Sequence, residues 1–293
     1  VGAYLSGGVD SSTLSAIILN YTQNQLDTFS ISFSDPEYDE SILQQQMVDF
    51  LGTAHHSVHT SDEIIGQVYP QVIWHTETPV LRTAPAPMFL LSKLVHEHQF
   101  KVIMTGEGAD EFLAGYDIFK EERIRHFWAE EPDSEKRSRL LEKLYPDIQA
   151  MTQTSQTFLT EFFRRGLLET NRPDYSHMLR WFSSRRALRF FSGELRQAAP
   201  NWEQQLEAHG EALGIPYPVD FMRWHPLHRA QYLEIVIFLS GYLLSSQGDR
   251  VAMAHSVEGR HPFLDHRLVE FSNRLPPGFK LRGLTEKYIL KTL

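Results

Sequence analysis

The feature that most constrains the fold is a loop rich in serine and glycine, which lies between an apolar segment and a helical pattern. The apolar segment is residues 1–5, and the helical pattern covers residues 10–22. The loop reads Ser6, Gly7, Gly8, Val9, Asp10, Ser11 and Ser12. A strand, a glycine turn and a helix in this order bring backbone N–H groups, hydroxyls and a positive helix end to one point. The pattern predicts a site for an anion with several oxygens, and we expect the pyrophosphate part of ATP.

The residues of this loop also indicate a cation. Glycine lets the backbone approach an anion closely, and the three serine hydroxyls can donate hydrogen bonds to its oxygens. Asp10 is the exception, because a carboxylate next to a polyphosphate is repelled unless a divalent cation lies between them. We therefore expect Mg²⁺ beside Asp10. An ordinary helix with Ser11 or Ser12 as its N-cap is the structural alternative.

Segments of β-forming residues alternate with helical patterns along the first part of the chain. Strands are predicted at residues 1–5, 28–33, 55–59 and 101–105, and helices at 10–22, 39–51, 61–74 and 88–98. This alternation is typical of an α/β fold, a parallel sheet with helices on both faces, whose ligands bind at the carboxyl ends of the strands. We predict about five strands, an ATP-binding core over residues 1–118, and a mainly helical continuation without a further strand over residues 119–293.

A second glycine turn follows the strand predicted at residues 101–105. It reads Thr105, Gly106, Glu107, Gly108, Ala109, Asp110 and Glu111. Because both turns follow parallel strands, we expect these carboxylates at the same sheet edge as Asp10. One of them can bind Mg²⁺, and another can act as a base or orient a nucleophile. The structural alternative is an acidic helix N-terminus, which is favourable by itself.

The composition excludes several kinds of site and partner. The chain has no cysteine, which excludes disulfides, thiolate metal sites and a thiol nucleophile within it. Its 28 basic and 37 acidic side chains give a net charge of −9, which disfavours nucleic acid as a general partner. No apolar run approaches the roughly 18 residues that span a bilayer, and no signal peptide is evident. We therefore predict no membrane partner and a cytoplasmic location.

Two later segments complete a set of four motifs. Residues 255–265 read H-S-V-E-G-R-H-P-F-L-D, and residues 286–291 read E-K-Y-I-L-K. Together with the loop at 6–12 and the turn at 106–111, they resemble the glutamine-hydrolysing asparagine synthetase family. The matching part is the C-terminal synthetase domain, a PP-loop ATP pyrophosphatase. The resemblance spans nearly the whole chain and implies a fold similar to the adenine nucleotide α-hydrolases.

The resemblance implies a role for each matching residue. Pyrophosphate would be held by Ser6, Gly7, Gly8, Ser11 and Ser12, Mg²⁺ by Asp10 and Asp110, and adenine by Ile31, Ser32, Phe33, Thr105 and Gly106. Glu107 would assist attack of the amine, and Lys287 would stabilise charge that develops on the phosphoryl oxygens. Glu111, Arg250 and Arg260 are assigned to the substrate, although a salt bridge explains either arginine equally well.

The implied reaction has two steps. A carboxylate, with the β-carboxylate of aspartate as the first expectation, attacks the α-phosphate of ATP and releases pyrophosphate. Ammonia then displaces AMP from the acyl-adenylate, which a site closed to water protects. The family's glutaminase half begins with a catalytic cysteine, so we expect ammonia from a glutaminase domain that is absent from this chain. Both ends of the sequence suggest a fragment of a longer protein, and the family suggests a homodimer.

Departures from the family pattern leave the substrate open. Apolar Val80 and Leu81 replace an acidic pattern found in some asparagine synthetases, and His261 stands where many members have a small or apolar residue. An amidotransferase or cyclase that acts on another carboxylate is therefore an alternative. Such an enzyme would make β-lactams or modify peptides.

Two further interpretations concern function more broadly. The segment 162–191 carries Arg164, Arg165, Arg172, Arg180, Arg185, Arg186 and Arg189 among aromatic residues, which would suit a tRNA-modifying enzyme. A catalytically inactive nucleotide-binding scaffold is the other interpretation, because fold alone does not decide function. His55, His56 and His59 do not indicate a metal site, since adjacent residues of a strand point to opposite faces.

Overall fold

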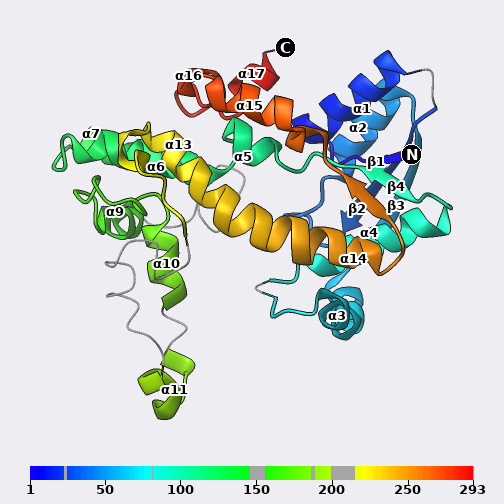
Figure 1. Ribbon diagram of the computed structural model, residues 1–293, viewed down its shortest axis with the longest axis horizontal. Helices are drawn as coiled ribbons and strands as arrows, with labels where there is room; N and C mark the ends of the chain where they lie inside the picture. The colour runs from blue at the N-terminus through cyan, green and yellow to red at the C-terminus, as the bar shows by residue number, and fades with distance from the viewer. Residues whose placement is uncertain (23–24, 81, 146–155, 186–188, 199–214, 293) are drawn as a thin grey trace. The chain divides into compact units, whose positions relative to one another are not determined.

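The computed structural model describes residues 1–22, 25–80, 82–145, 156–185, 189–198 and 215–292 (Figure 1). The chain divides into two units. The first unit consists of Val1–Leu113, Phe238–Leu275 and Tyr288–Leu293, and the second of Ala114–Ile237 and Pro276–Lys287. The sheet belongs to the first unit, which therefore draws on segments far apart in the sequence.

All five strands of the sheet are parallel, in the order β3-β2-β1-β4-β5. Their bounds are Gly2–Tyr4 (β1), Asp27–Phe33 (β2), Ala54–Thr60 (β3), Val102–Met104 (β4) and Glu258–Arg260 (β5). Helices α1 (Val9–Tyr21) and α2 (Ser41–Leu51) lie on one face of the sheet, and α3 (Asp62–Thr76) and α4 (Pro85–Glu97) on the other (Figure 1). This is the arrangement that right-handed crossovers produce for this strand order. The predicted fold class, a parallel α/β sheet of about five strands, is thus confirmed, with helices forming most of the remaining regular structure.

The fifth strand corrects the expectation that no strand follows residue 119. Glu258 and Gly259 pair with Val102 and Ile103 of β4. The strand is held by backbone bonds, including Glu258 N–H to Lys101 O at 2.8 Å and Thr105 N–H to Arg260 O at 2.9 Å. A three-residue Glu-Gly-Arg strand has no apolar alternation, so no sequence pattern could reveal it.

The helices of the first unit lie on the faces of the sheet and beyond the carboxyl ends of its strands. They are Val9–Tyr21 (α1), Ser41–Leu51 (α2), Asp62–Thr76 (α3), Pro85–Glu97 (α4), Ala109–Leu113 (α5), Arg250–Met253 (α14), His266–Arg274 (α15) and Tyr288–Lys291 (α17). Phe29 and Ile103 of the sheet are buried against Leu91 and Val95 of α4. The burial of these apolar side chains fixes α4 against its face of the sheet.

The described residues of the second unit form helices and no strand. The α-helices are Asp117–Ala129 (α6), Glu135–Ser138 (α7), Gln156–Arg164 (α9), Met178–Arg185 (α10), Gly193–Ala198 (α11), Pro226–Leu233 (α13) and Pro277–Lys280 (α16), and a π-helix, Glu234–Asp249, contains a boundary between the units. Ile124 and Trp128 of α6 lie in one buried apolar cluster with Phe163. Ile118 and Phe119 of the same helix lie in another with Leu227 of α13. Helix α6 therefore connects both parts of this core.

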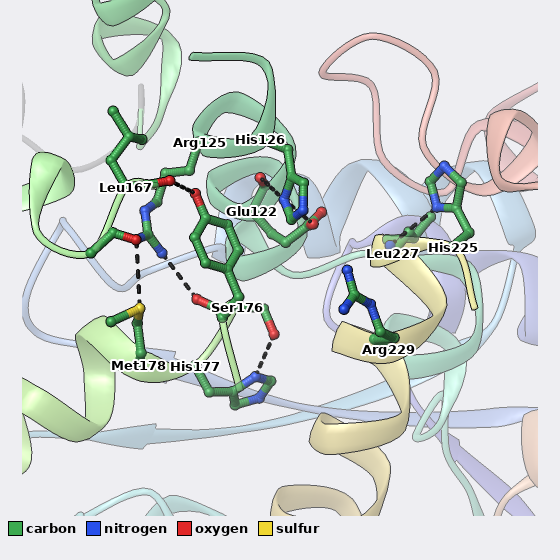
Figure 2. A network of polar contacts seen from close by, with 12 residues as sticks. Glu122, Arg125, His126, Leu167, Ser176, His177, Met178, His225, Leu227 and Arg229 are labelled. Atoms are coloured by element: carbon green, nitrogen blue, oxygen red, sulfur yellow. Dashed lines mark hydrogen bonds and ion pairs between the residues drawn. The ribbon is translucent and has the colours of Figure 1, made fainter. Parts of the chain in front are cut away.

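A buried arginine organises the irregular segment of the second unit. Arg125 of α6 is 1% exposed and donates from Nε to the carbonyl of Phe163 at 3.2 Å and from Nη1 to that of Tyr175 at 3.0 Å. Its Nη2 donates to the Arg165 carbonyl at 2.9 Å. The same nitrogen approaches Met178 Sδ at 3.8 Å (Figure 2). The planar guanidinium fork thus satisfies carbonyls that no helix or strand pairs.

Candidate functional site

The serine and glycine loop is closed by its own hydroxyls. Ser11 Oγ lies 3.1 Å from Ser6 Oγ and accepts from the Ser6 N–H at 3.2 Å, while Gly8 N–H donates to Ser6 Oγ at 3.2 Å. Gly7 has φ +81°, and a Cβ there would lie 2.8 Å from Leu43 Cβ. Only glycine suits this position, because the backbone is left-handed and helix α2 packs directly against it. Both hydroxyls lie at the N-terminus of α1, where anions are favoured.

The second glycine turn packs onto the first. A Cβ on Gly106 would lie 3.1 Å from Asp10 Cβ and 3.5 Å from the Ser11 nitrogen. Gly108 has φ +95°, and a Cβ there would lie 2.2 Å from Leu264 Cδ2. The two turns therefore meet at the carboxyl edge of the sheet, with the segment that follows β5 packed against the second turn.

A cavity of about 320 Å³ lies where the two turns meet. Among the residues that the resemblance assigns to a site, those that line it are Ser6, Asp10, Ser11, Ile31, Phe33, Thr105, Gly106, Glu107 and Asp110. Serine hydroxyls, carboxylates and apolar side chains thus share one cavity. This combination can hold a nucleotide beside groups capable of acid and base chemistry.

The carboxyl group of Glu107, which lines this cavity, has a strongly raised pKa. Burial, with smaller contributions from the charges of Asp110 and Asp10, raises the pKa of Glu107 to about 7. A carboxyl with this pKa exchanges its proton near neutral pH, which suits a general base. The environment of Glu107 therefore agrees with the role that the resemblance assigns to it.

The carboxylates of Asp10 and Asp110 suit a divalent cation that is shared with a phosphate. Both residues line the cavity, and Mg²⁺ prefers oxygen ligands. Within the described ranges, no group of three acidic or histidine residues could hold a metal ion by itself. One or two carboxylates completed by phosphate oxygens and water are the usual Mg²⁺ site of a nucleotide enzyme, so these two residues fit the cation.

Other residues assigned to the site do not line the cavity. Gly7, Gly8 and Ser12 belong to the loop without lining the cavity, and Ser32 Oγ lies 3.1 Å from His59 Nδ1. Glu111 is fully buried. The Arg250 guanidinium donates to the Thr76 carbonyl. Arg260 is exposed and forms an ion pair with Glu258 at 2.8 Å. Lys287 belongs to the second unit, so its role in adenylylation stays a prediction.

Several residues that line the cavity were not identified from the sequence. They are Tyr4, Leu5, Phe29, Ser30, Tyr38, Glu40, Gln44, Met88 and Leu91. Tyr4 and Leu5 directly precede the loop, a position that could have indicated them. Gln44, Met88 and Leu91 lie within helices, where spacing along one helix does not show which residues face a cavity.

His261 is placed next to the site by a hydrogen bond. Its Nδ1 lies 2.7 Å from Thr105 Oγ1, which also accepts from the Glu107 N–H at 3.4 Å. Burial lowers the pKa of His261, which favours the neutral ring. This departure from the family pattern therefore contacts the turn that carries Glu107.

The arginine-rich segment forms ion pairs within the second unit. Arg164 pairs with Asp133 at 3.0 Å, Arg172 with Asp174 at 2.9 Å and Arg180 with Glu121 at 3.0 Å. These pairs give the arginines a structural role and weaken the case for an RNA surface. Arg186, the side chain of Arg185 and Leu81 lie outside the described residues. No described helix has the length and apolar character needed to cross a membrane.

Comparison with known proteins identifies the family of this chain. Residues 1–293 match the family model for asparagine synthase. The chain belongs to the asparagine synthase family. This assignment agrees with the resemblance of the four motifs and with the parallel sheet, and the asparagine synthase family uses ATP.

Relatives within the asparagine synthase family carry two kinds of name. Amidase chyE of Penicillium rubens is 29% identical over 99% of this chain and 46% of its own length. Amidase chry2 of Gibberella zeae is 26% identical over 99% and 46%. Asparagine synthetase 1, glutamine-hydrolysing, of Bacillus subtilis is 25% identical over 99% and 43%. The chain spans less than half the length of each of these relatives.

Proposed function

We propose that this chain carries out the ATP-dependent half of amide synthesis. The observation that supports it most directly is one cavity that contains the serine loop, two carboxylates suited to Mg²⁺, and Glu107 with its raised pKa. In the first step, a substrate carboxylate oxygen attacks the α-phosphorus of ATP, and the bond to pyrophosphate breaks. In the second, ammonia attacks the acyl carbon, and AMP leaves with the former carboxylate oxygen.

The residues of the loop serve the first step. The hydroxyls of Ser6 and Ser11 and the N-terminus of α1 bind phosphate oxygens, and Lys287 stabilises the charge that accumulates as pyrophosphate departs. Asp10 and Asp110 hold Mg²⁺, which supplies positive charge to the phosphates. These groups act by position and charge, as phosphoryl transfer requires.

Glu107 serves the second step. When ammonia adds to the acyl carbon, its nitrogen becomes positively charged and must lose a proton before the amide is formed. The Glu107 carboxylate accepts that proton, and a pKa of about 7 keeps it available near neutral pH. The tight packing of Gly106 and Gly108 around the turn restricts the position of this carboxylate.

The first candidate for the acid is the β-carboxylate of aspartate, with ammonia from a glutaminase domain and asparagine as the product. A second candidate is supported by the names of relatives, since two proteins similar over the whole chain are amidases. In that case the adenylylated acid is another carboxylate and the mechanism is unchanged. A homodimer is the assembly that the family resemblance suggests.

The test is ATP–pyrophosphate exchange by the protein with Mg²⁺, with aspartate compared with a panel of other carboxylic acids. Exchange that depends on aspartate supports asparagine synthesis, whereas exchange with another acid alone supports the second candidate. Failure of every acid to promote exchange, in a protein that binds ATP, would contradict the proposed function.

A further inference from the structure

Lys287 has a backbone conformation that is rare for a residue with a side chain. Its φ is +48°, in the left-handed region, where the Cβ of any residue other than glycine is crowded. Such a conformation persists only where the surrounding structure holds it, and it occurs disproportionately often at functional sites. The contacts that hold this part of the chain therefore decide where the Lys287 side chain begins.

The segment that leads to Lys287 packs along one face of helix α6. Leu281 is 1% exposed and lies in one buried apolar cluster with Ile118 and Phe119. Its main-chain carbonyl accepts a hydrogen bond from Arg123 Nη1 at 2.6 Å. Both an apolar and a polar contact thus fix the chain to α6 shortly before Lys287.

An ion pair with the same helix lies directly before Lys287 in the chain. Lys120 Nζ lies 3.0 Å from Glu286 Oε2 and 3.1 Å from Asp117 Oδ1. The side chains of Lys120 and Glu286 are 15% and 22% exposed, so water and salt screen this pair less than an ordinary surface pair. Because Glu286 directly precedes Lys287, the ion pair restrains the backbone at the point where it becomes left-handed.

The residues after Lys287 are also held. They form α17, which packs against α1 and α5, the helices that begin at the two glycine turns. Lys287 thus connects an ion pair on one side to a packed helix on the other. Both restrict the backbone from which its side chain extends.

We propose that Lys120 is a positioning residue for adenylylation, which acts by holding Glu286 and therefore the backbone of Lys287. A cation stabilises departing pyrophosphate only from a defined place, because the charge develops on particular phosphoryl oxygens. Lys120 does not line the cavity, so its effect on the reaction passes through Lys287. This inference rests on the proposed function, which assigns to Lys287 the charge that accumulates as pyrophosphate leaves.

The test is steady-state ATP–pyrophosphate exchange by Lys120→Met, which keeps the length of the side chain and removes its charge. We expect kcat to fall by about 10–100-fold and KM for ATP to stay within about threefold, because a displaced cation weakens the transition state more than the bound substrate. Lys120→Arg keeps a cation that can pair with Glu286 and should recover most of the rate. A change in KM without a change in kcat would contradict the inference.

A double variant separates positioning from a general effect on the fold. Lys287→Met should lower exchange at least as much as Lys120→Met does. Adding Lys120→Met to Lys287→Met should then cause no further loss, because Lys120 acts through Lys287. Losses that multiply in the double variant, or full activity of Lys287→Met, would overturn the inference. If Lys120→Met does not fold, Glu286→Gln weakens the same ion pair from the other side and should lower kcat in the same way.

The matched control is Lys93→Met, the same change at an exposed lysine of α4, whose Nζ lies 3.9 Å from Glu97 Oε1. This variant should exchange pyrophosphate at the wild-type rate. Wild-type exchange by Lys120→Met would overturn the role of Lys120 and leave the proposed function intact. Failure of every acid to promote exchange by a wild-type protein that binds ATP would instead count against the proposed function itself.

Discussion

At the scale of single residues, the proposed chemistry depends most on the carboxyl group of Glu107. Glu107→Gln keeps the shape of the side chain and removes the base. We expect pyrophosphate exchange to stay within a few-fold of wild type and amide formation to fall by about 10²–10⁴-fold, because only the second step needs a proton acceptor. Both rates can be measured on the same protein preparation. An equal loss in the two assays would instead assign Glu107 to binding of ATP or the acid.

The raised pKa of Glu107 also predicts how stability depends on pH. Because this carboxyl has a pKa of about 7 in the folded state and an ordinary one in the unfolded state, the folded state binds the proton more tightly. Its ionisation therefore costs the wild-type protein stability as pH rises from about 4.5 to 7. Glu107→Gln should exceed wild type in free energy of unfolding at pH 8, by up to about 2–3 kcal/mol. Urea unfolding at pH 5 and pH 8 tests this, and a pH-independent difference would argue against it.

Gly108 is a second position at which one residue decides the geometry of the site. In Gly108→Ala, the new Cβ would meet Leu264 in a left-handed backbone conformation, so we expect a loss of about 3 kcal/mol in stability. The matched control is Gly66→Ala in α3, where no atom lies within 4 Å of the added Cβ. That variant should gain about 0.5–1 kcal/mol. Similar thermal midpoints for the two variants would contradict the packing argument.

At the scale of elements, Arg125 of α6 joins a helix to the irregular segment at residues 163–175. Arg125→Lys keeps the charge but loses the planar fork, so several buried carbonyls lose their donor, and we expect a loss of roughly 2–4 kcal/mol. Arg123→Lys on the same helix is the control, because Arg123 donates to one carbonyl, that of Leu281. Urea unfolding of both variants gives the comparison. Equal losses would indicate a general effect of arginine in α6.

The elements also show what a sequence can predict. The four longer or apolar strands follow from β-forming residues between glycine and helix signals, and the parallel arrangement follows from their alternation with helices. β5 escaped prediction because backbone bonds to β4 alone define it. Gln44, which lines the cavity and donates to the Ile31 carbonyl, escaped because the spacing of residues along α2 does not show which of them faces a cavity. The glycine turns are different, because glycine itself indicates a turn in the sequence. Gly7, Gly106 and Gly108 were therefore all placed in turns from the sequence alone.

At the scale of the whole molecule, the nitrogen source is the property to test. The 293 residues contain no cysteine, so this chain has no thiol for glutamine hydrolysis. We expect the chain to form amide with ammonium salts and not with glutamine, and acid-dependent release of AMP measures both. Amide formation from glutamine by the purified chain would show that hydrolysis does not need the cysteine of a glutaminase domain.

The division of the chain into two units is a second property of the whole molecule. The prediction placed a core at residues 1–118 and a helical continuation after it, whereas the first unit also includes Phe238–Leu275 and Tyr288–Leu293. Late segments thus return to the sheet and bring with them the motif at residues 255–265, whose Leu264 packs at Gly108. Motifs far apart in sequence can therefore serve one cavity.

The late arrival of β5 matters during synthesis of the protein. Val102 of β4 pairs with Glu258, 156 residues later in the chain. At a translation speed of 5–20 residues per second, the ribosome needs roughly 8–30 s to deliver the partner of β4 after β4 itself has emerged. Throughout that interval the nascent sheet presents an unpaired edge, which is the kind of surface that aggregates or recruits chaperones. From the order of the strands we expect the yield of this protein to depend on how fast its middle region is translated.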